Sequence, residues 1–283
     1  MIDWGREQHG VVAHGRLAYR DSFLPGHAEP GRGPAFVLLH GIGSGAPSWQ
    51  GLAAALGPEV RTLAWDAPGY GSSDPLPMPR PSAQDYADVL GQWLGPLSLQ
   101  RPLLVGHSLG AIVAARWAAQ HGAGLRGLVL ASPARGYGGG PSDEREARRR
   151  ERIDAIERLG PQAMAEERAA RLCRPGADPS LVAQVREIML RVSVKGYVQA
   201  AHLLADGHLV ADLAALPCPV TVVCGALDGI TPPQACAQVA HAAGVPLRLL
   251  DGVGHACYLE DPSAFADVLR QAWDGGLEHP HDR

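Results

Sequence analysis

Short apolar runs alternate with helix-spaced apolar residues in two parts of the chain, about 35–131 and 218–283. In this alternation each apolar run is expected to be a buried strand, and each helical stretch crosses from one parallel strand to the next. The pattern predicts strands at 36–39, 61–66, 102–105, 128–131, 219–224 and 247–250, and helices at about 49–56, 82–97, 111–117, 232–243 and from 262 onward. The chain is therefore predicted to have an α/β fold with a mostly parallel sheet.

The segments outside this alternation have different patterns. Residues 11–13 and 16–23 favour an antiparallel hairpin at the edge of the sheet, and the Gly/Pro-rich stretch 25–34 favours a loop. Between the two βα parts, residues 134–209 contain helix-spaced apolar positions and no strand alternation. We therefore predict a core domain from 1–133 and 210–283, with 134–209 inserted as a helical cap.

Composition and charge exclude several classes of protein. Apolar residues make up 46% of the 283 residues, and the net charge of −4 comes without a basic face, so a nucleic-acid partner is not expected. The first residues are charged, and no apolar run approaches the ~18 residues of a membrane span, so a cytoplasmic location without membrane association is expected. Five cysteines without C-x-x-C spacing are expected to be reduced, without a role in binding metal.

The segment 106–110, Gly-His-Ser-Leu-Gly, carries the first candidate chemistry. It fits G-x-S-x-G and lies between an apolar strand and a helix, which is the context that holds a nucleophilic serine in a tight, strained turn. The helix that follows directs its N-terminal dipole toward negative charge that develops beside the serine. Ser108 is therefore predicted to be a nucleophile.

A serine nucleophile needs a histidine to accept its proton and a carboxylate to orient that histidine. Asp228 follows strand 219–224, and His255 follows strand 247–250. The carboxyl ends of parallel strands meet at one edge of a sheet, so Ser108, Asp228 and His255 are predicted to form a catalytic triad. The rival carboxylates are Asp206 and Asp212, which lie in or near the insertion, and Asp251, which is too close in sequence to reach back to His255.

Backbone N–H groups are expected to stabilise the oxyanion of the tetrahedral intermediate. Leu109 follows the nucleophile, and Ile42 lies in the glycine-rich segment 40–45, where backbone can approach a substrate closely. That segment matches neither phosphate-binding glycine motif. We predict Ile42 and Leu109 as the oxyanion-hole donors, and Asp66 as a residue that hydrogen-bonds within its own turn, 66–71.

These motifs together resemble the α/β-hydrolase superfamily. The resemblance rests on segment 40–45, Trp49, segment 66–74, the turn at Ser108, Asp228 and the Gly254-His255 pair, and it covers nearly the whole chain. It implies an α/β-hydrolase fold, a mostly parallel eight-stranded sheet flanked by helices with a helical cap, together with the triad and the two-donor oxyanion hole. It implies no metal or organic cofactor.

Within this superfamily the layout is similar to enol-lactone hydrolases, carbon–carbon hydrolases of meta-cleavage products, small carboxylesterases and cofactor-free haloperoxidases. The carbon–carbon hydrolases usually have Asn before the nucleophile and Trp after the histidine, where this chain has His107 and Ala256. Haloalkane dehalogenases and epoxide hydrolases use an aspartate nucleophile, which Ser108 replaces. These departures favour an esterase or lactonase.

The predicted activity is hydrolysis of a small ester, thioester or lactone through an acyl-enzyme. A small-molecule substrate is the expected partner, and the oligomeric state, homo-oligomer included, is left open. Residues near the triad that are expected to contact substrate are Trp49, His107, Cys257 and Tyr258. The alternatives are carbon–carbon bond hydrolysis, haloperoxidase or perhydrolase chemistry, and a ligand-binding protein on a hydrolase fold.

Overall fold

The computed structural model describes residue 4 and residues 6–23 and 34–275, and these form an eight-stranded sheet in the order β1-β2-β4-β3-β5-β6-β7-β8. β1 and β2 pair antiparallel, as do β2 and β4, and every other neighbouring pair is parallel. The bounds are β1 Glu7–Val12, β2 Gly15–Asp21, β3 Ala35–Leu39, β4 Arg61–Trp65, β5 Leu103–His107, β6 Gly127–Ala131, β7 Val220–Gly225 and β8 Leu247–Leu250. The predicted mostly parallel sheet is confirmed.

The edge hairpin is longer than the sequence pattern indicated. β1 begins at Glu7, although its alternation of apolar and polar residues is weak before Val11, and the chain turns at residues 13–14. Pairing with β2 supplies backbone hydrogen bonds along the whole strand, which local propensity does not show. The loop predicted at 25–34 lies almost entirely outside the described residues.

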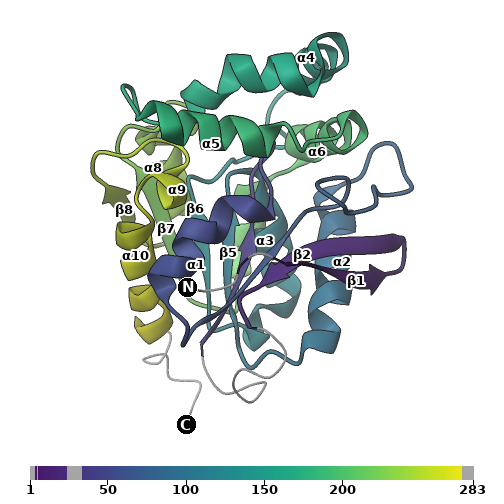
Figure 1. Cartoon of the computed structure of the whole chain (residues 1–283). Helices are drawn as coiled ribbons and strands as arrows, with labels where there is room; N and C mark the ends of the chain where they lie inside the picture. Colours follow the sequence, from purple (N-terminus) through teal and green to yellow (C-terminus); the bar gives the residue numbers. More distant parts are fainter. Residues whose placement is uncertain (1–3, 5, 24–33, 276–283) are drawn as a thin grey trace.

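Helices cover both faces of the sheet (Figure 1). Phe36 and Leu38 face a cluster that includes α1 (Gln50–Leu56) and α10 (Pro262–Gly275), while Val37 and Leu39 face a cluster that includes α2, α3 and α8. The bounds of these last three helices are Ala83–Leu94, Leu109–His121 and Pro233–Ala242. Alternate residues of β3 therefore pack into the apolar layers on the two faces of the sheet. This explains why the strand is apolar at every position.

The helix starts follow local sequence signals. Ser82 caps α2 through the predicted box: its hydroxyl accepts from the Asp85 N–H, and the Asp85 carboxylate accepts from the Ser82 N–H. Short 3-10 turns lie at Ala46–Trp49, Gly95–Leu97 and Gly122–Gly124. The turn at Ala46–Trp49 leads into α1, so the predicted helix at 49–56 is present with a tighter first turn.

Helices fill the chain between β6 and β7, where the sequence predicts a cap. They are α4 (Ser142–Arg168), η4 (Ala169–Leu172), α5 (Pro179–Met189), α6 (Val194–Asp206), α7 (Leu209–Asp212) and η5 (Leu213–Ala215). In Figure 1, α4, α5 and α6 lie together above one edge of the sheet. α4 is broken at Gly160, which has a φ of 72° and is followed by Pro161. Division of the chain into core and cap domains at 134–209 stays a prediction.

The register of the parallel strands explains why the candidate site forms at one edge. Leu39 pairs with Gly106, Ala131 pairs with Val223, and Gly225 pairs with Leu250. The residues that follow these strand ends therefore emerge side by side, beneath the cap helices. No helix in the described part of the chain is both long and apolar enough to cross a membrane.

Candidate active site

Ser108 occupies a strained turn between β5 and α3. Its φ of 52° and ψ of −114° are rare for a residue with a side chain. The turn is tight: a Cβ on Gly106 would lie 2.6 Å from the Gly110 carbonyl oxygen and 2.7 Å from Ala111 Cα. Glycine is therefore required at 106, and the turn carries Ser108 to the wall of a cavity while leaving it only 6% exposed.

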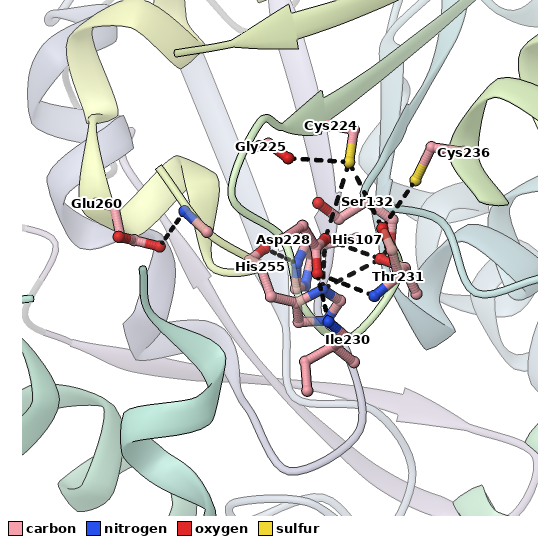
Figure 2. Close-up of polar contacts among 11 residues, drawn as sticks. His107, Ser132, Cys224, Gly225, Asp228, Ile230, Thr231, Cys236, His255 and Glu260 are labelled. Atoms are coloured by element: carbon pink, nitrogen blue, oxygen red, sulfur yellow. Dashed lines mark hydrogen bonds and ion pairs between the residues drawn. The ribbon is translucent and has the colours of Figure 1, made fainter. Parts of the chain in front are cut away.

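His255 and Asp228 form a buried pair at the same edge (Figure 2). His255 Nδ1 lies 2.9 Å from Asp228 Oδ2, and the residues are 4% and 3% exposed. The other carboxylate oxygen, Oδ1, accepts hydrogen bonds from the N–H groups of Ile230 and Thr231 at 2.8 and 2.9 Å. Because both oxygens are engaged, the carboxylate is fixed and can orient the imidazole.

The charge state of Asp228 follows from these contacts. Burial alone would raise the pKa of its carboxyl, but hydrogen bonding to His255, the charge of that imidazole and the two N–H donors outweigh burial and lower the pKa to about 2. Asp228 is therefore ionised at neutral pH. This is the state that stabilises a proton on His255.

Thr231 is a member of this network that the sequence analysis did not identify. Its hydroxyl oxygen lies 2.9 Å from Asp228 Oδ2, 2.9 Å from the Ser132 carbonyl oxygen and 3.2 Å from His255 Nδ1. With one proton, it can donate to one of the two oxygen acceptors at a time. The available signal was its position three residues after Asp228, where a hydroxyl can turn back onto the carboxylate.

Ser108 and His255 line the same cavity, but no hydrogen bond joins them in the described structure. With Nδ1 directed at Asp228, the imidazole Nε2 is the nitrogen left to accept a proton from Ser108. Hydrogen bonds of this kind are often long before substrate binds. The structure thus brings the imidazole and carboxylate together and places the hydroxyl on the shared wall, while the catalytic roles stay predictions.

The backbone around Ile42 and Leu109 fits the predicted oxyanion hole. Gly41 lies against the nucleophile, since a Cβ added to it would be 2.9 Å from Ser108 Cβ. Ile42 and Leu109 both line the cavity, and within the described residues neither N–H has a hydrogen-bond partner. Leu109 is the first residue of α3, where helix N–H groups are free. Both donors are thus available to a ligand.

The side chains of His40 and Asp66 hydrogen-bond to the backbone near the two ends of the 41–45 loop. Asp66 Oδ1 accepts a hydrogen bond from the Ala46 N–H at 2.7 Å, so the expectation that its side chain bonds within its own turn was wrong. His40 Nε2 accepts from the Ala67 N–H at 3.0 Å, which leaves Nδ1 to donate to the Gly41 carbonyl at 2.8 Å. The charge of Asp66 would raise the pKa of His40, but burial outweighs it and lowers the pKa. The lowered pKa keeps His40 neutral.

Two of the four predicted substrate contacts line the cavity, namely His107 and Tyr258. His107 Nε2 donates to the His255 carbonyl oxygen at 2.9 Å, and its ring lies 4.7 Å from the His255 ring. Burial, together with the charge of His255, lowers the pKa of His107 to about 3, so it is neutral at pH 7. Burial raises the pKa of Tyr258 to about 12, and its hydroxyl donates to Ser48 at 3.0 Å.

Trp49 and Cys257 are not among the cavity-lining residues, which corrects their assignment as substrate contacts. Trp49 is fully buried and stacks on Tyr258 with ring centroids 3.8 Å apart, so it supports the cavity wall from behind. Cys257 is also fully buried, and burial raises the pKa of its thiol, which makes it unreactive. Closeness in sequence to the 40–45 loop, for Trp49, and to His255, for Cys257, did not reveal the direction of either side chain.

The cavity has a volume of about 810 Å³ and lies between the sheet edge and the cap. Its floor contains Ser108, His255 and the 41–44 loop, and its roof comes from α4, η4, α5 and α6. Within the described residues, no three His, Cys, Asp or Glu side chains are grouped to hold a metal ion. Ser108, His255, Ile42 and Leu109 thus line one enclosed space.

Comparison with known proteins identifies the family of the chain. The model of the alpha/beta hydrolase family matches residues 36–268. The chain belongs to this family. The chain is 28% identical over 259 residues to 2-succinyl-6-hydroxy-2,4-cyclohexadiene-1-carboxylate synthase of Klebsiella pneumoniae, covering 87% of this chain and 95% of that protein.

Two solved structures match almost the entire chain. The enol-lactonase of Burkholderia xenovorans LB400 superposes with a TM-score of 0.81 at 21% identity, covering 94% of this chain and 100% of the other. A thermophilic esterase from Thermogutta terrifontis has a TM-score of 0.80 at 24% identity, covering 96% and 99%. At these identities the likeness shows the α/β-hydrolase fold, as the sequence motifs indicated.

Proposed function

We propose that this α/β-hydrolase is a serine hydrolase that cleaves a small ester, thioester or lactone through an acyl-enzyme intermediate. The observation that carries the proposal is the buried His255–Asp228 pair at 2.9 Å, which shares a cavity with Ser108 in its strained turn. Neither an ordinary core histidine nor a surface serine needs such an arrangement. The esterase and enol-lactonase neighbours have the same fold.

In the proposed reaction, Ser108 Oγ attacks the substrate carbonyl while His255 Nε2 accepts the hydroxyl proton. The carbonyl π electrons move onto oxygen, and the N–H groups of Ile42 and Leu109 stabilise the resulting oxyanion. The intermediate collapses, His255 returns the proton to the leaving alcohol or thiol, and an acyl-Ser108 ester remains. Water then attacks this ester with His255 again as base, which releases the acid and regenerates the serine.

Ionised Asp228 supports both halves of this cycle. It accepts the Nδ1–H of His255, which keeps Nε2 as the basic nitrogen, and it stabilises the imidazolium formed after each proton transfer. Neutral His107 donates to the His255 carbonyl and so adds no second positive charge beside the base. His255 is thereby held by hydrogen bonds between its ring and Asp228 and between its carbonyl and His107.

The proposal is tested by turnover of p-nitrophenyl acetate and p-nitrophenyl butyrate. Ser108→Ala should lower kcat by about 10³-fold or more, since the nucleophile is lost and only binding and the oxyanion donors remain. Ser263→Ala, an exposed serine at the start of α10, is the matched control and should be unchanged. Undiminished turnover in folded Ser108→Ala protein would refute the nucleophile.

The other activities are distinguished by this assay together with added peroxide and ring-cleavage products. A ligand-binding protein shows no Ser108-dependent turnover. A perhydrolase forms peracid when peroxide is added, and a carbon–carbon hydrolase turns over ring-cleavage products faster than esters. Product analysis with and without peroxide therefore separates a perhydrolase from an esterase, and the relative rates on ring-cleavage products and esters separate a carbon–carbon hydrolase.

A further inference from the structure

The roof of the active-site cavity is strongly cationic, although the chain as a whole has a net charge of −4. Six arginines line the cavity, against two glutamates, Glu144 and Glu151. The six are Arg135, Arg145, Arg148, Arg152, Arg168 and Arg171. Five of them come from α4 and η4, so the excess positive charge is concentrated on one wall opposite Ser108.

Half of these arginines are already engaged elsewhere. Arg145 lies 3.6 Å from Asp206, Arg148 lies 3.5 Å from Glu151, and Arg135 donates to Gln238. Within the described residues, no carboxylate lies within ion-pair distance of Arg152, Arg168 or Arg171. Three guanidinium groups on the cavity wall therefore have no anionic partner among the residues that the structure describes.

Two of the three converge on one phenol. Arg168 Nη1 donates to the Tyr197 hydroxyl at 3.3 Å, and Arg152 is in polar contact with the hydroxyls of Tyr197 and Tyr137. Tyr197 is 2% exposed on α6, so it holds both arginines at the inner side of the cap. A neutral hydroxyl orients a guanidinium but does not neutralise it.

This arrangement is unfavourable when the cavity contains no anion. Two like charges close to one hydroxyl repel each other, and the low-dielectric surroundings weaken their screening. A bound anion would remove this cost and satisfy the free N–H donors. The planar guanidinium matches a carboxylate through two parallel hydrogen bonds, which makes a carboxylate the best-fitting occupant.

We propose that Arg152 and Arg168 bind a carboxylate of the substrate, so that the enzyme acts on esters or lactones carrying a second, free acid group. This inference rests on the proposed serine-hydrolase function and names its substrate class. The arginines contact the unreactive end of the substrate, and their binding energy holds the reacting carbonyl at Ser108. The cavity wall thereby selects anionic substrates over neutral ones of the same length.

The kinetic test compares matched ester pairs. The monoethyl half-esters of glutarate, adipate and pimelate are compared with ethyl pentanoate, hexanoate and heptanoate, with ethanol release as the measurement. One charged hydrogen-bonded contact corresponds to about a 10- to 100-fold preference in kcat/KM for the half-ester of fitting length. The preference should fall as salt rises, because ions screen the attraction. Equal kcat/KM for every pair overturns the proposal.

Variants locate the preference at the proposed arginines. Arg152→Gln and Arg168→Gln should each reduce the preference ratio about 10-fold, chiefly through the KM of the half-ester. Arg158→Gln is the matched control: it removes the same charge from an exposed position of α4 that does not line the cavity, and its ratio should equal that of the wild type. An equal loss in Arg158→Gln would show a diffuse charge effect and contradict the proposal.

Direct binding separates this inference from the catalytic one. Calorimetric titration of the wild type with adipate should show binding that Arg152→Gln weakens about 10-fold, whether or not any ester is hydrolysed. Hydrolysis without adipate binding would retain the proposed function and overturn the carboxylate site. Inorganic phosphate that binds more tightly than adipate, and depends on Arg152, would assign the site to phosphoryl groups and overturn the carboxylate assignment.

Discussion

The carboxylate of Glu260 accepts a hydrogen bond from the N–H of Gly254, the residue before His255, at 2.8 Å. Its other oxygen accepts from the Arg174 N–H in the cap at 2.9 Å, and the carboxylate is fully buried. Figure 2 shows Glu260 beside the His255 loop. One buried acid thus joins the loop that carries the base to the segment that roofs the cavity.

Glu260→Gln should therefore disturb both the loop that carries His255 and the cap segment at Arg174. The amide NH2 would meet a backbone donor where the carboxylate accepts, which should lower the free energy of unfolding by about 1–3 kcal/mol. We expect kcat on p-nitrophenyl butyrate to fall about 10-fold through displacement of His255. Chemical denaturation and steady-state kinetics measure the two effects, with exposed Glu157→Gln as the control. Loss of stability with kcat unchanged would show that Glu260 does not position the base.

Asp228→Asn tests the orientation of the base. An asparagine can present its amide NH2 to Nδ1, which favours the tautomer with the proton on Nε2 and removes the lone pair that should accept from Ser108. We expect kcat to fall about 10⁴-fold with little change in KM. Asp251→Asn, at an exposed carboxylate that follows β8, should retain wild-type kcat. A loss of less than 10-fold would place the orienting group elsewhere.

Gly41→Ala tests the oxyanion loop. The added Cβ would lie 2.9 Å from Ser108 Cβ and 3.1 Å from His107 Nδ1, so the loop must shift away from the nucleophile. Displacing the Ile42 donor should lower kcat by about 10- to 100-fold, with KM less affected. Gly95→Ala is the control, because its Cβ would meet nothing within 4 Å. If both variants keep full activity, the loop does not serve the reaction.

The stability of the fold should decrease in mild acid because of His107. Its folded-state pKa of about 3 lies below its ordinary value of 6.5, so the unfolded chain binds a proton between these pH values while the native protein does not. The contribution of neutral His107 to the free energy of unfolding is therefore fully present above pH 6.5 and is lost as the pH falls toward 3. This single group should lower the free energy of unfolding by about 2 kcal/mol between pH 8 and pH 5.

Urea denaturation of the wild type and of His107→Gln measures this dependence. The variant should lose less stability between pH 8 and pH 5, since glutamine does not titrate while its amide can still donate to the His255 carbonyl. Asp228 acts outside this range: its stabilisation is lost only as pH falls below its ordinary value of 3.8 toward about 2. Identical pH dependence in the two proteins would contradict the assignment to His107.

Features that depend on short stretches of chain were predictable from the sequence. The βα alternation gave the parallel strands, and the glycines around Ser108 indicated the turn, because both follow from local sterics and periodicity. Asp228 and His255 could be brought together because parallel strands align their carboxyl ends. The two residues follow β7 and β8, which pair in parallel, and their side chains meet at 2.9 Å.

Features that depend on packing between distant segments were not predictable. Trp49 and Cys257 lie near the site in sequence, but their side chains point into the core, which spacing does not reveal. Glu260 and the arginines of α4 and η4 gain their roles only when the cap is placed over the sheet. On the sequence alone, the charged stretch at 143–152 has the pattern of a solvent-facing helix.

The most direct measurement of the central claim is mass spectrometry of the protein after reaction with a fluorophosphonate. A serine activated by His255 should take up one phosphonyl group with loss of fluoride, and peptide mapping should place it on Ser108. His255→Ala should abolish labelling, while Ser263→Ala should label as the wild type does. Modification of a different residue, or unchanged labelling in the His255→Ala variant, would contradict Ser108 as the nucleophile and His255 as its base.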